Sequence, residues 1–311
     1  MKTLAILLLI SMTAMAGTGV PVIFDTDMGN DIDDALALAM LHGLQSRGEV
    51  RLVAVTVTKD NPWAARYVSA VNTFYGRGGI PIGVVKNGVT KDEGGYARKA
   101  IDNGRHAWSE KTEDAVGLLR RVLEKEADGS VVVIQVGFST NLAGLLESPG
   151  GRDLVARKVK FLSLMAGDFA GRGPEYNVKE DVKSCQKLVQ VWPTARVWSG
   201  FEVGRTIKYP ARSIERDFGW APKHPVADGY RAYMKFPYDR ETWDLTAVLH
   251  ALRPEAGYFD LSTAGTVAVD DQGFTKFTET PGGRDRYLKV NDVQRARVLE
   301  AMIWLASQPS R

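Results

Sequence analysis

Short apolar runs alternate with helical patterns along most of the chain, and this order restricts the folds open to it. The strand-like runs are VIFDTD (22–27), RLVAVTV (51–57), SVVVIQVG (130–137) and VKFLSLMAG (159–167). Strands that are apolar without interruption must bury both of their faces, which is typical of parallel sheets covered by helices. The sequence therefore predicts an α/β fold with a Rossmann-like, mostly parallel sheet flanked by helices.

The C-terminal part of the chain departs from this alternation. TVAVDDQGFTKFTE (266–279) predicts a small antiparallel hairpin that turns at Asp271–Gly273. A final helix is expected from about Asn291 to Ser307. The region 205–240 is rich in proline, lysine and aromatic residues and has the least regular pattern. Because no linker divides the chain, we expect one catalytic domain over residues 17–311.

The N-terminal stretch MKTLAILLLISMTAMA has the pattern of a secretory signal peptide. Lys2 precedes an apolar run from 4 to 10, and small residues occupy the positions before Gly17. The apolar run is well short of the roughly 20 residues that a membrane span needs. We therefore expect residues 1–16 to be removed and the protein to be exported, periplasmic or secreted, with no membrane partner after cleavage.

Charge and cysteine content exclude some classes of partner. The chain has 40 Lys and Arg against 37 Asp and Glu, a net charge of +3, and the two signs are interleaved. Such a mild balance does not indicate binding to nucleic acid or to a membrane surface. Its one cysteine, Cys185, forms no internal disulfide and is expected in the core.

Five aspartates lie in the turn between the first predicted strand and its helix: Asp25, Asp27, Asp31, Asp33 and Asp34. Carboxylates this close repel one another by roughly 1 kcal/mol per pair even in water. Asp31 or Asp33 could cap the helix N-terminus, which explains one or two of the five. A hard cation held by oxygen ligands, Ca²⁺ or Mg²⁺, accounts for the others.

Four segments then carry a family resemblance. DTDMGNDIDDALAL (25–38) resembles the aspartate signature of the nucleoside hydrolases, which are calcium-dependent N-ribohydrolases. The segments 131–146, 164–188 and 242–252 resemble later parts of that family in the same order. The likeness spans nearly the whole chain after the predicted signal peptide. It implies the nucleoside hydrolase fold and hydrolysis of the N-glycosidic bond of ribonucleosides to free base and ribose.

The same resemblance implies roles for a set of metal ligands. Asp27 would contact a Ca²⁺ ion and act as general base toward the attacking water. Asp34, Asp244 and the backbone carbonyl of Val136 would be further ligands of the ion. These groups come from distant parts of the chain, which the fold must bring together.

The resemblance also implies which residues hold the substrate. Glu175 and Asn177 resemble residues that bind the ribose hydroxyls, and Met165 resembles one that packs against the sugar. The widened turn at NDI leaves Asp31 and Asp33 as alternatives for the ribose 2-hydroxyl, and helix phase favours Asp33. The loop after Met165 is shorter than in the family and lacks the Asn used on the 5-hydroxyl.

The largest departure from the family pattern is Trp243, which stands where inosine- and uridine-preferring members have a proton-donating histidine. Trp243 either stacks on the base, which predicts a preference for purines, or packs in the wall of the site. His250 is expected to pack on a helix. His106 lies in a loop that could close over the site.

Two other functions were weighed against hydrolysis of nucleosides. An exported nucleoside-binding protein would use the same residues without turnover. A strand followed by Asp-x-Asp is also found in haloacid-dehalogenase-type Mg²⁺ phosphatases, but DTDMGND lacks the Thr that usually follows there. We expect a homodimer or homotetramer that takes a small-molecule nucleoside.

Overall fold

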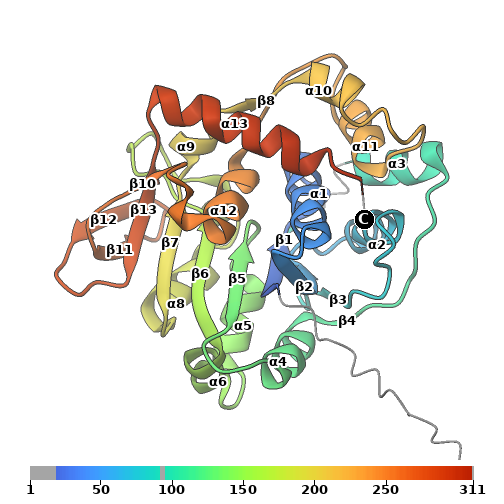
Figure 1. Cartoon of the computed structure of the whole chain (residues 1–311). Coiled ribbons are helices and arrows are strands. Elements are labelled where there is room, and N and C mark those ends of the chain that lie inside the picture. The colour runs from blue at the N-terminus through green and yellow to red at the C-terminus, as the bar shows by residue number, and fades with distance from the viewer. Residues whose placement is uncertain (1–18, 92–94, 310–311) are drawn as a thin grey trace, which may run out of the picture.

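The computed structural model describes residues 19–91 and 95–309 (Figure 1). The predicted signal peptide, 1–16, lies outside the described residues, so it stays a prediction, as does the start of the catalytic domain at residue 17. None of the helices in the described part of the chain has the length and hydropathy needed to cross a membrane.

A central mixed sheet organises the molecule, with the strand order β12-β11-β13-β7-β6-β5-β1-β2-β3-β4 and β10 paired to β13. All neighbours from β13 to β4 are parallel, which confirms the predicted mostly parallel sheet. β8 and β9 form a separate antiparallel pair. The strands are β1 (Val20–Thr26), β2 (Val50–Val57), β3 (Ile82–Val84), β4 (Glu113–Asp114), β5 (Val131–Gln135), β6 (Val159–Met165), β7 (Ala195–Ser199), β8 (Lys208–Tyr209), β9 (Arg240–Glu241), β10 (Asp260–Leu261), β11 (Gly265–Val269), β12 (Thr275–Glu279) and β13 (Asp285–Lys289).

Helices cover both faces of the sheet, as Figure 1 shows. α1, α12 and α13 pack together on one face, and α4, α5, α6 and α8 pack together on the other. The helices are α1 (Asp33–Ser46), α2 (Pro62–Phe74), α3 (Tyr96–Gly104), α4 (Ala115–Lys125), α5 (Thr140–Glu147), α6 (Gly151–Lys158), α7 (Tyr176–Glu180), α8 (Val182–Val191), α9 (Phe201–Arg205), α10 (Ala211–Arg216), α11 (Pro225–Tyr233), α12 (Trp243–Leu252) and α13 (Asp292–Ala306), with a 3₁₀ turn at Pro254–Ala256.

The apolar strands separate two hydrophobic cores. Because successive side chains of a strand point to opposite faces, Val22 and Phe24 of β1 enter one core and Ile23 enters the other. β5 repeats the alternation with Ile134 in the first core and Val133 in the second. A strand with two buried faces must be apolar at every position, which is why these runs were recognisable in the sequence.

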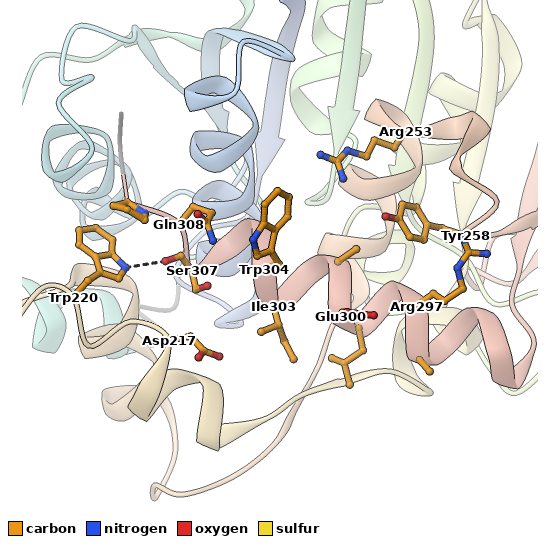
Figure 2. Close-up of a pocket in the computed structure, with 14 residues that line it drawn as sticks. Asp217, Trp220, Arg253, Tyr258, Arg297, Glu300, Ile303, Trp304, Ser307 and Gln308 are labelled. Atoms are coloured by element: carbon orange, nitrogen blue, oxygen red, sulfur yellow. Dashed lines mark hydrogen bonds between the residues drawn. The ribbon is translucent and has the colours of Figure 1, made fainter.

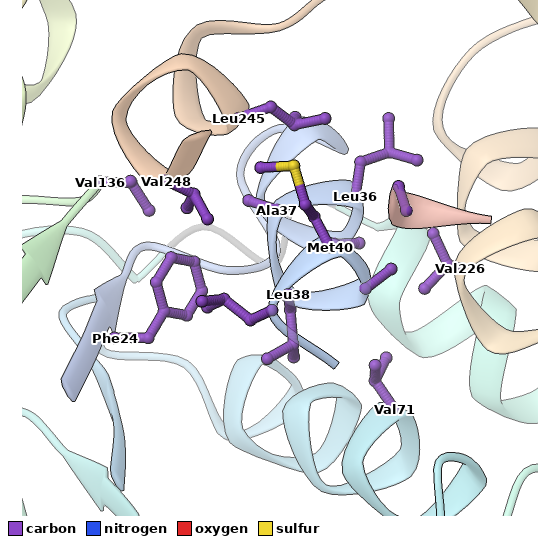
Figure 3. Packing of buried hydrophobic residues seen from close by; sticks show 14 of the residues in the cluster. Phe24, Leu36, Ala37, Leu38, Met40, Val71, Val136, Val226, Leu245 and Val248 are labelled. Atoms are coloured by element: carbon purple, nitrogen blue, oxygen red, sulfur yellow. The ribbon is translucent and has the colours of Figure 1, made fainter. Parts of the chain in front are cut away.

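α1 is buried on nearly all sides, from Asp33 to Leu44. Figure 3 shows its side chains Leu36, Leu38 and Met40 among apolar groups from β1, α2 and α12. Gly43 permits close packing against α13, since a Cβ there would lie 2.2 Å from the Leu305 carbonyl oxygen. The first turn of α1 is therefore fixed in position by the core around the helix.

The C-terminal elements agree with the sequence in part. β11 and β12 form the predicted antiparallel hairpin. α13 begins after Asn291, whose side chain forms a capping box with Gln294. The sequence reading missed β13, which joins the sheet between β7 and β11.

The sheet has a topological switch point at β1. β1 lies between β2 and β5. From β1 the chain adds β2, β3 and β4 on one side and later adds β5, β6 and β7 on the other. Ligands of open parallel sheets bind at the carboxyl ends of strands beside such a point. The aspartate-rich turn follows β1 at this place.

A buried ion pair joins the added strand β13 to the parallel sheet. Asp285 of β13 receives hydrogen bonds from Arg196 Nε (2.6 Å) and Nη2 (2.8 Å). The Trp198 indole and the Val267 amide donate to the same carboxylate, each at 2.8 Å. Asp285 is fully buried, so every one of these donors depends on it.

We predict that Asp285→Ala lowers the free energy of unfolding by about 3–5 kcal/mol, because the Arg196 charge is left buried without its partner. Glu147→Ala is the matched control: it removes an exposed pair with Lys187 and should cost less than about 1 kcal/mol. Urea denaturation of both variants measures the difference. Equal losses would contradict a structural role for the buried pair.

Candidate active site

A cavity of about 330 Å³ opens beside the carboxyl ends of β1 and β5. Six of the residues that line it carry carboxylates, and one of the described lining residues, Arg240, is a cation. The lining residues are Asp27, Asn30, Asp31, Asp33, Asp34, Val136, Met165, Glu175, Tyr176, Asn177, Phe201, Tyr233, Arg240, Trp243 and Asp244. Every site residue named from the sequence lies in this set.

The aspartate-rich turn forms one wall. Asp27, Asp33 and Asp34 are each at most 4% exposed, and Asp31 is less buried. The N-cap of α1 is Ile32, with no side-chain cap, so the expectation that Asp31 or Asp33 caps this helix is wrong. The widened turn moves the cap position onto an apolar residue and places Asp33 inside the first helical turn.

Few donors serve these carboxylates. Asn30 Nδ2 donates to Asp27 (2.9 Å), and the Asp244 amide donates to Asp33 (3.1 Å). Thr26 donates its hydroxyl proton to Asp34. Repulsion between neighbouring carboxylates remains among the causes that raise the pKa values of Asp33, Asp34 and Asp244.

Asp33, Asp34 and Asp244 fit a bound cation. One carboxylate oxygen from each lies within 4.8 Å of the others, and all three residues are buried. Burial first, and then repulsion from neighbouring carboxylates, raises their pKa values well above the ordinary range. Burial also raises the pKa of Asp27 to about 6. A hard cation with oxygen ligands would offset both the burial of these carboxylates and the repulsion between them.

β5 supplies the floor of the site. A Cβ at Gly137 would lie 2.4 Å from the Asp27 amide nitrogen, so only glycine lets the two chain segments come this close. The Val136 carbonyl accepts a hydrogen bond from Asn177 Nδ2 at 2.7 Å. Asn141, behind the site, donates to Asp25 (2.9 Å) and is buried.

The wall after β6 carries Met165, Glu175 and Asn177, all buried. Glu175 caps α7 and accepts from the amides of Asn177 (2.9 Å) and Gly167 (3.1 Å). Burial raises the pKa of Glu175 to about 7, against the effect of these amides. The three side chains face the aspartate-rich turn across one cavity, as the resemblance implied.

Arg240 separates the two alternatives left open in the turn. It forms an ion pair with Asp31, with Nε at 2.9 Å from Oδ1 and a second bond from Nη2 to Oδ2. Both oxygens of Asp31 therefore have partners. Asp33 lies instead in the tight group with Asp34 and Asp244.

Aromatic side chains also line the cavity. Trp243 stacks on Phe201, with 5.4 Å between ring centroids, and its indole N–H donates to the Phe201 carbonyl at 3.0 Å. The guanidinium of Arg240 lies 5.2 Å from the Trp243 centroid and 5.3 Å from that of Tyr233. Trp243 thus has two partners besides any substrate.

The sequence reading missed Arg240, Tyr233 and Phe201. Tyr233 and Arg240 lie in the irregular region 205–240 and Phe201 lies just before it, outside the segments that resemble the family, and the structure brings them to the site through α11, β9 and α9. One sequence signal pointed to Arg240: it lies shortly before Thr242, Trp243 and Asp244, which belong to a segment that resembles the family.

None of the four histidines lines the cavity, within the residues that the structure describes. His106 pairs with Asp228 at 2.8 Å, at the side of α11, so the structure does not place it over the site. His250 is buried on α12 and packs near Phe259, as expected. Its pKa falls to about 4 because of burial.

A larger cavity of about 1110 Å³ lies elsewhere, along α13 (Figure 2). Its labelled side chains include Trp220, Trp304, Tyr258 and Arg253. The acidic side chains there, Asp217 and Glu300, belong to no group of carboxylates close enough to hold a metal, among the described residues. Size alone therefore does not locate the chemistry, and the smaller cavity is the candidate active site.

Comparison with known proteins agrees with this geometry. The family model of the inosine-uridine preferring nucleoside hydrolases matches residues 22–301, and the chain belongs to this family. It is accordingly an N-ribohydrolase, an enzyme that cleaves the N-glycosidic bond of nucleosides. A search of curated proteins by sequence gave no match.

Solved structures share the fold at low sequence identity. A plant nucleoside hydrolase matches with a TM-score of 0.74 and 19% identity, over 93% of this chain and 99% of the other. An inosine-guanosine nucleoside hydrolase matches with 0.75 and 19%, over 92% and 98%. A purine-preferring ribonucleoside hydrolase from Gardnerella vaginalis matches with 0.72 and 17%, over 92% and 99%.

We predict that a chelator lowers the melting temperature by roughly 5 °C and that divalent cation restores it, because the ion would stabilise the folded chain by mass action. The Asp33→Asn variant is the comparison: with one charge fewer in the group, its melting should respond less to chelator. Differential scanning calorimetry measures both. Wild-type melting that is identical with and without chelator would contradict a metal site here.

Proposed function

We propose that this enzyme uses Ca²⁺ and an aspartate general base to hydrolyse ribonucleosides to free base and ribose. The observation that carries the proposal is one cavity lined by both a buried group of carboxylates and aromatic rings. Carboxylates suit a cation and sugar hydroxyls, and flat rings suit a nucleobase. The test is incubation with a panel of nucleosides followed by assay of free ribose.

Asp27, Asp34, Asp244 and the Val136 carbonyl are the proposed protein ligands of Ca²⁺. All four line the same cavity, and Asp33 is close enough to Asp34 and Asp244 to contribute. A donor set made only of oxygen atoms favours Ca²⁺ over softer metals. When bound, the ion would orient the sugar hydroxyls and make the attacking water easier to deprotonate.

Asp27 is the proposed general base. Its Oδ2 accepts a hydrogen bond from Asn30 at 2.9 Å, and the side chain lines the cavity, where the attacking water would bind. In the reaction, the water oxygen bonds to the anomeric carbon while one water proton passes to Asp27. The C–N bond breaks with its electron pair going to the base, which takes up a proton.

Asp33, Glu175 and Asn177 are proposed to bind the ribose hydroxyls, with Met165 against the sugar ring. Their positions on facing walls would hold the ribose between the carboxylate group and the cavity opening. Asp31 is held by Arg240, which makes it the weaker candidate for the 2-hydroxyl.

We predict that Asp27→Asn lowers kcat by about 10³-fold or more, because base and ligand are lost together. Asn141→Ala is the comparison: it removes a buried hydrogen bond behind the site and should lower the melting temperature with a much smaller change in kcat. Steady-state release of ribose measures kcat. Asp27→Asn that keeps a tenth of wild-type turnover would rule out the general-base assignment.

Trp243 is proposed to face the nucleobase. Base–aromatic stacking is worth about 1–3 kcal/mol and increases with ring overlap, so we predict a kcat/KM for inosine at least about 10-fold above that for uridine. Trp243→Ala should remove this preference, whereas Trp304→Ala, on the outer face of α13, should not. Equal kcat/KM values for the two nucleosides in the wild type would instead assign Trp243 to the wall.

Export is a further proposal, and it rests on the sequence of residues 1–16 alone. A periplasmic or secreted enzyme would act on nucleosides outside the cytoplasm, as a homodimer or homotetramer. Fractionation of cells that express the full chain, together with the N-terminal residue of the recovered protein, tests it. Recovery of uncleaved protein from the cytoplasm would contradict export.

A further inference from the structure

Cleavage of an N-glycosidic bond leaves an electron pair on the departing base, and the site must stabilise it. Inosine- and uridine-preferring members of the family have a proton-donating histidine for this task, and Trp243 stands at that position here. Its indole N–H already donates to the Phe201 carbonyl at 3.0 Å. No histidine, lysine or cysteine is among the described residues that line the cavity. Another donor must therefore serve the base.

Arg240 lines the cavity beside the aromatic rings that are proposed to receive the base. It lies on β9, just before α12, with its guanidinium over the rings of Tyr233 and Trp243. Cation–π contact and the ion pair with Asp31 hold the guanidinium plane in one orientation. Arg240 is thus a fixed cation beside the rings that would receive the base.

The hydrogen bonds of Arg240 leave donors available. A guanidinium carries five N–H groups. Nε and Nη2 each use one on Asp31, and Nη1 uses one on Glu241 at 3.3 Å. Two N–H groups then have no partner among the described residues. The side chain is 19% exposed, so these donors are neither fully solvated nor closed off from the cavity.

We propose that Arg240 hydrogen-bonds the departing nucleobase and stabilises the negative charge that develops on it, with Asp31 as the residue that positions the guanidinium. The inference rests on the hydrolysis proposed above. Arg240 acts by charge and hydrogen bonding and keeps its own proton, because a guanidinium does not deprotonate at neutral pH. The base, once free, takes its proton from solvent.

A second role must be distinguished from this one. Arg240 ties β9 to the aspartate-rich turn through Asp31, so its loss could simply displace the carboxylates. Displaced carboxylates would slow every substrate alike. Loss of a donor to the leaving group would slow only those substrates whose leaving group needs help.

Two substrates separate the roles. Inosine has a poor leaving group, whereas 4-nitrophenyl β-D-ribofuranoside releases a phenolate that is stable without a donor. Arg240→Gln should lower kcat/KM for inosine by about 100-fold, as expected for removal of one charged donor to a developing anion. For the nitrophenyl riboside it should fall by about 3-fold or less on the same reasoning.

Arg253→Gln is the matched control. Arg253 also forms a two-bond ion pair, with Glu49 at 3.0 and 2.8 Å and at similar exposure, but it lines the other cavity. Its substitution should leave both substrates unaffected. Arg240→Lys keeps the charge without the planar fork, so its loss on inosine should be smaller than that of Arg240→Gln, and it carries the test if the Gln variant does not fold.

Asp31→Asn is the last variant. It weakens the ion pair that positions the guanidinium and keeps Arg240 itself. A selective loss on inosine supports the positioning role, and equal losses on both substrates overturn it. For Arg240→Gln, equal losses on both substrates, or full activity on inosine, overturn the proposal. A wild-type enzyme that cleaves neither substrate refutes the proposed function itself, which is a separate result.

Discussion

The repulsion among buried carboxylates at the carboxyl end of β1 is the constraint on which the rest of the structure depends. Asp33 and Asp34 lie in the first turn of α1, and Asp244 lies in the first turn of α12. The two helix dipoles favour these charges by about 0.3–1 kcal/mol each, far less than the several kcal/mol that burial of an ion costs. A scaffold that holds them together therefore needs two things: a cation in the site, and packing strong enough to keep α1 and α12 in place. The buried α1 and the two cores of the sheet provide the second.

Local patterns explain how much of this fold could be read from the sequence. Strands such as β5 are apolar on both faces, and the turn after β1 carries its aspartates side by side. Both signals are contained in a few consecutive residues, so they predict the parallel sheet and the position of the site at its edge. Asp244 was different: it is 211 residues from Asp33, to which its amide donates. Only the family resemblance assigned it to the site.

The parts that could not be predicted depend on contacts between distant segments. Ile32 is the N-cap of α1, and Asp31 is paired with Arg240, 209 residues later in the chain. The sequence near Asp31 shows that it could cap the helix. It does not show that Arg240 lies close enough to form an ion pair with Asp31, so the two outcomes could not be compared. β13 was missed for a related reason, since its place in the sheet depends on the buried pair of Asp285 with Arg196.

Two of the three departures from the family pattern are connected through the ion pair of Asp31 with Arg240. The widened turn supplies Asp31, and the segment before Trp243 supplies Arg240, so a longer turn and a missing histidine are parts of a single arrangement. The carboxylates that face the sugar are held by α1, α12 and the central sheet. Of the groups proposed to face the base, Arg240, Phe201 and Tyr233 come from β9, α9 and α11 at the periphery, and Trp243 comes from α12 itself. A rigid scaffold can keep the geometry at the anomeric carbon while peripheral segments change. Phe201 and Tyr233 are on such segments, whereas Trp243, beside Asp244 on α12, and Arg240, paired with Asp31, tie the proposed base site to the carboxylate group.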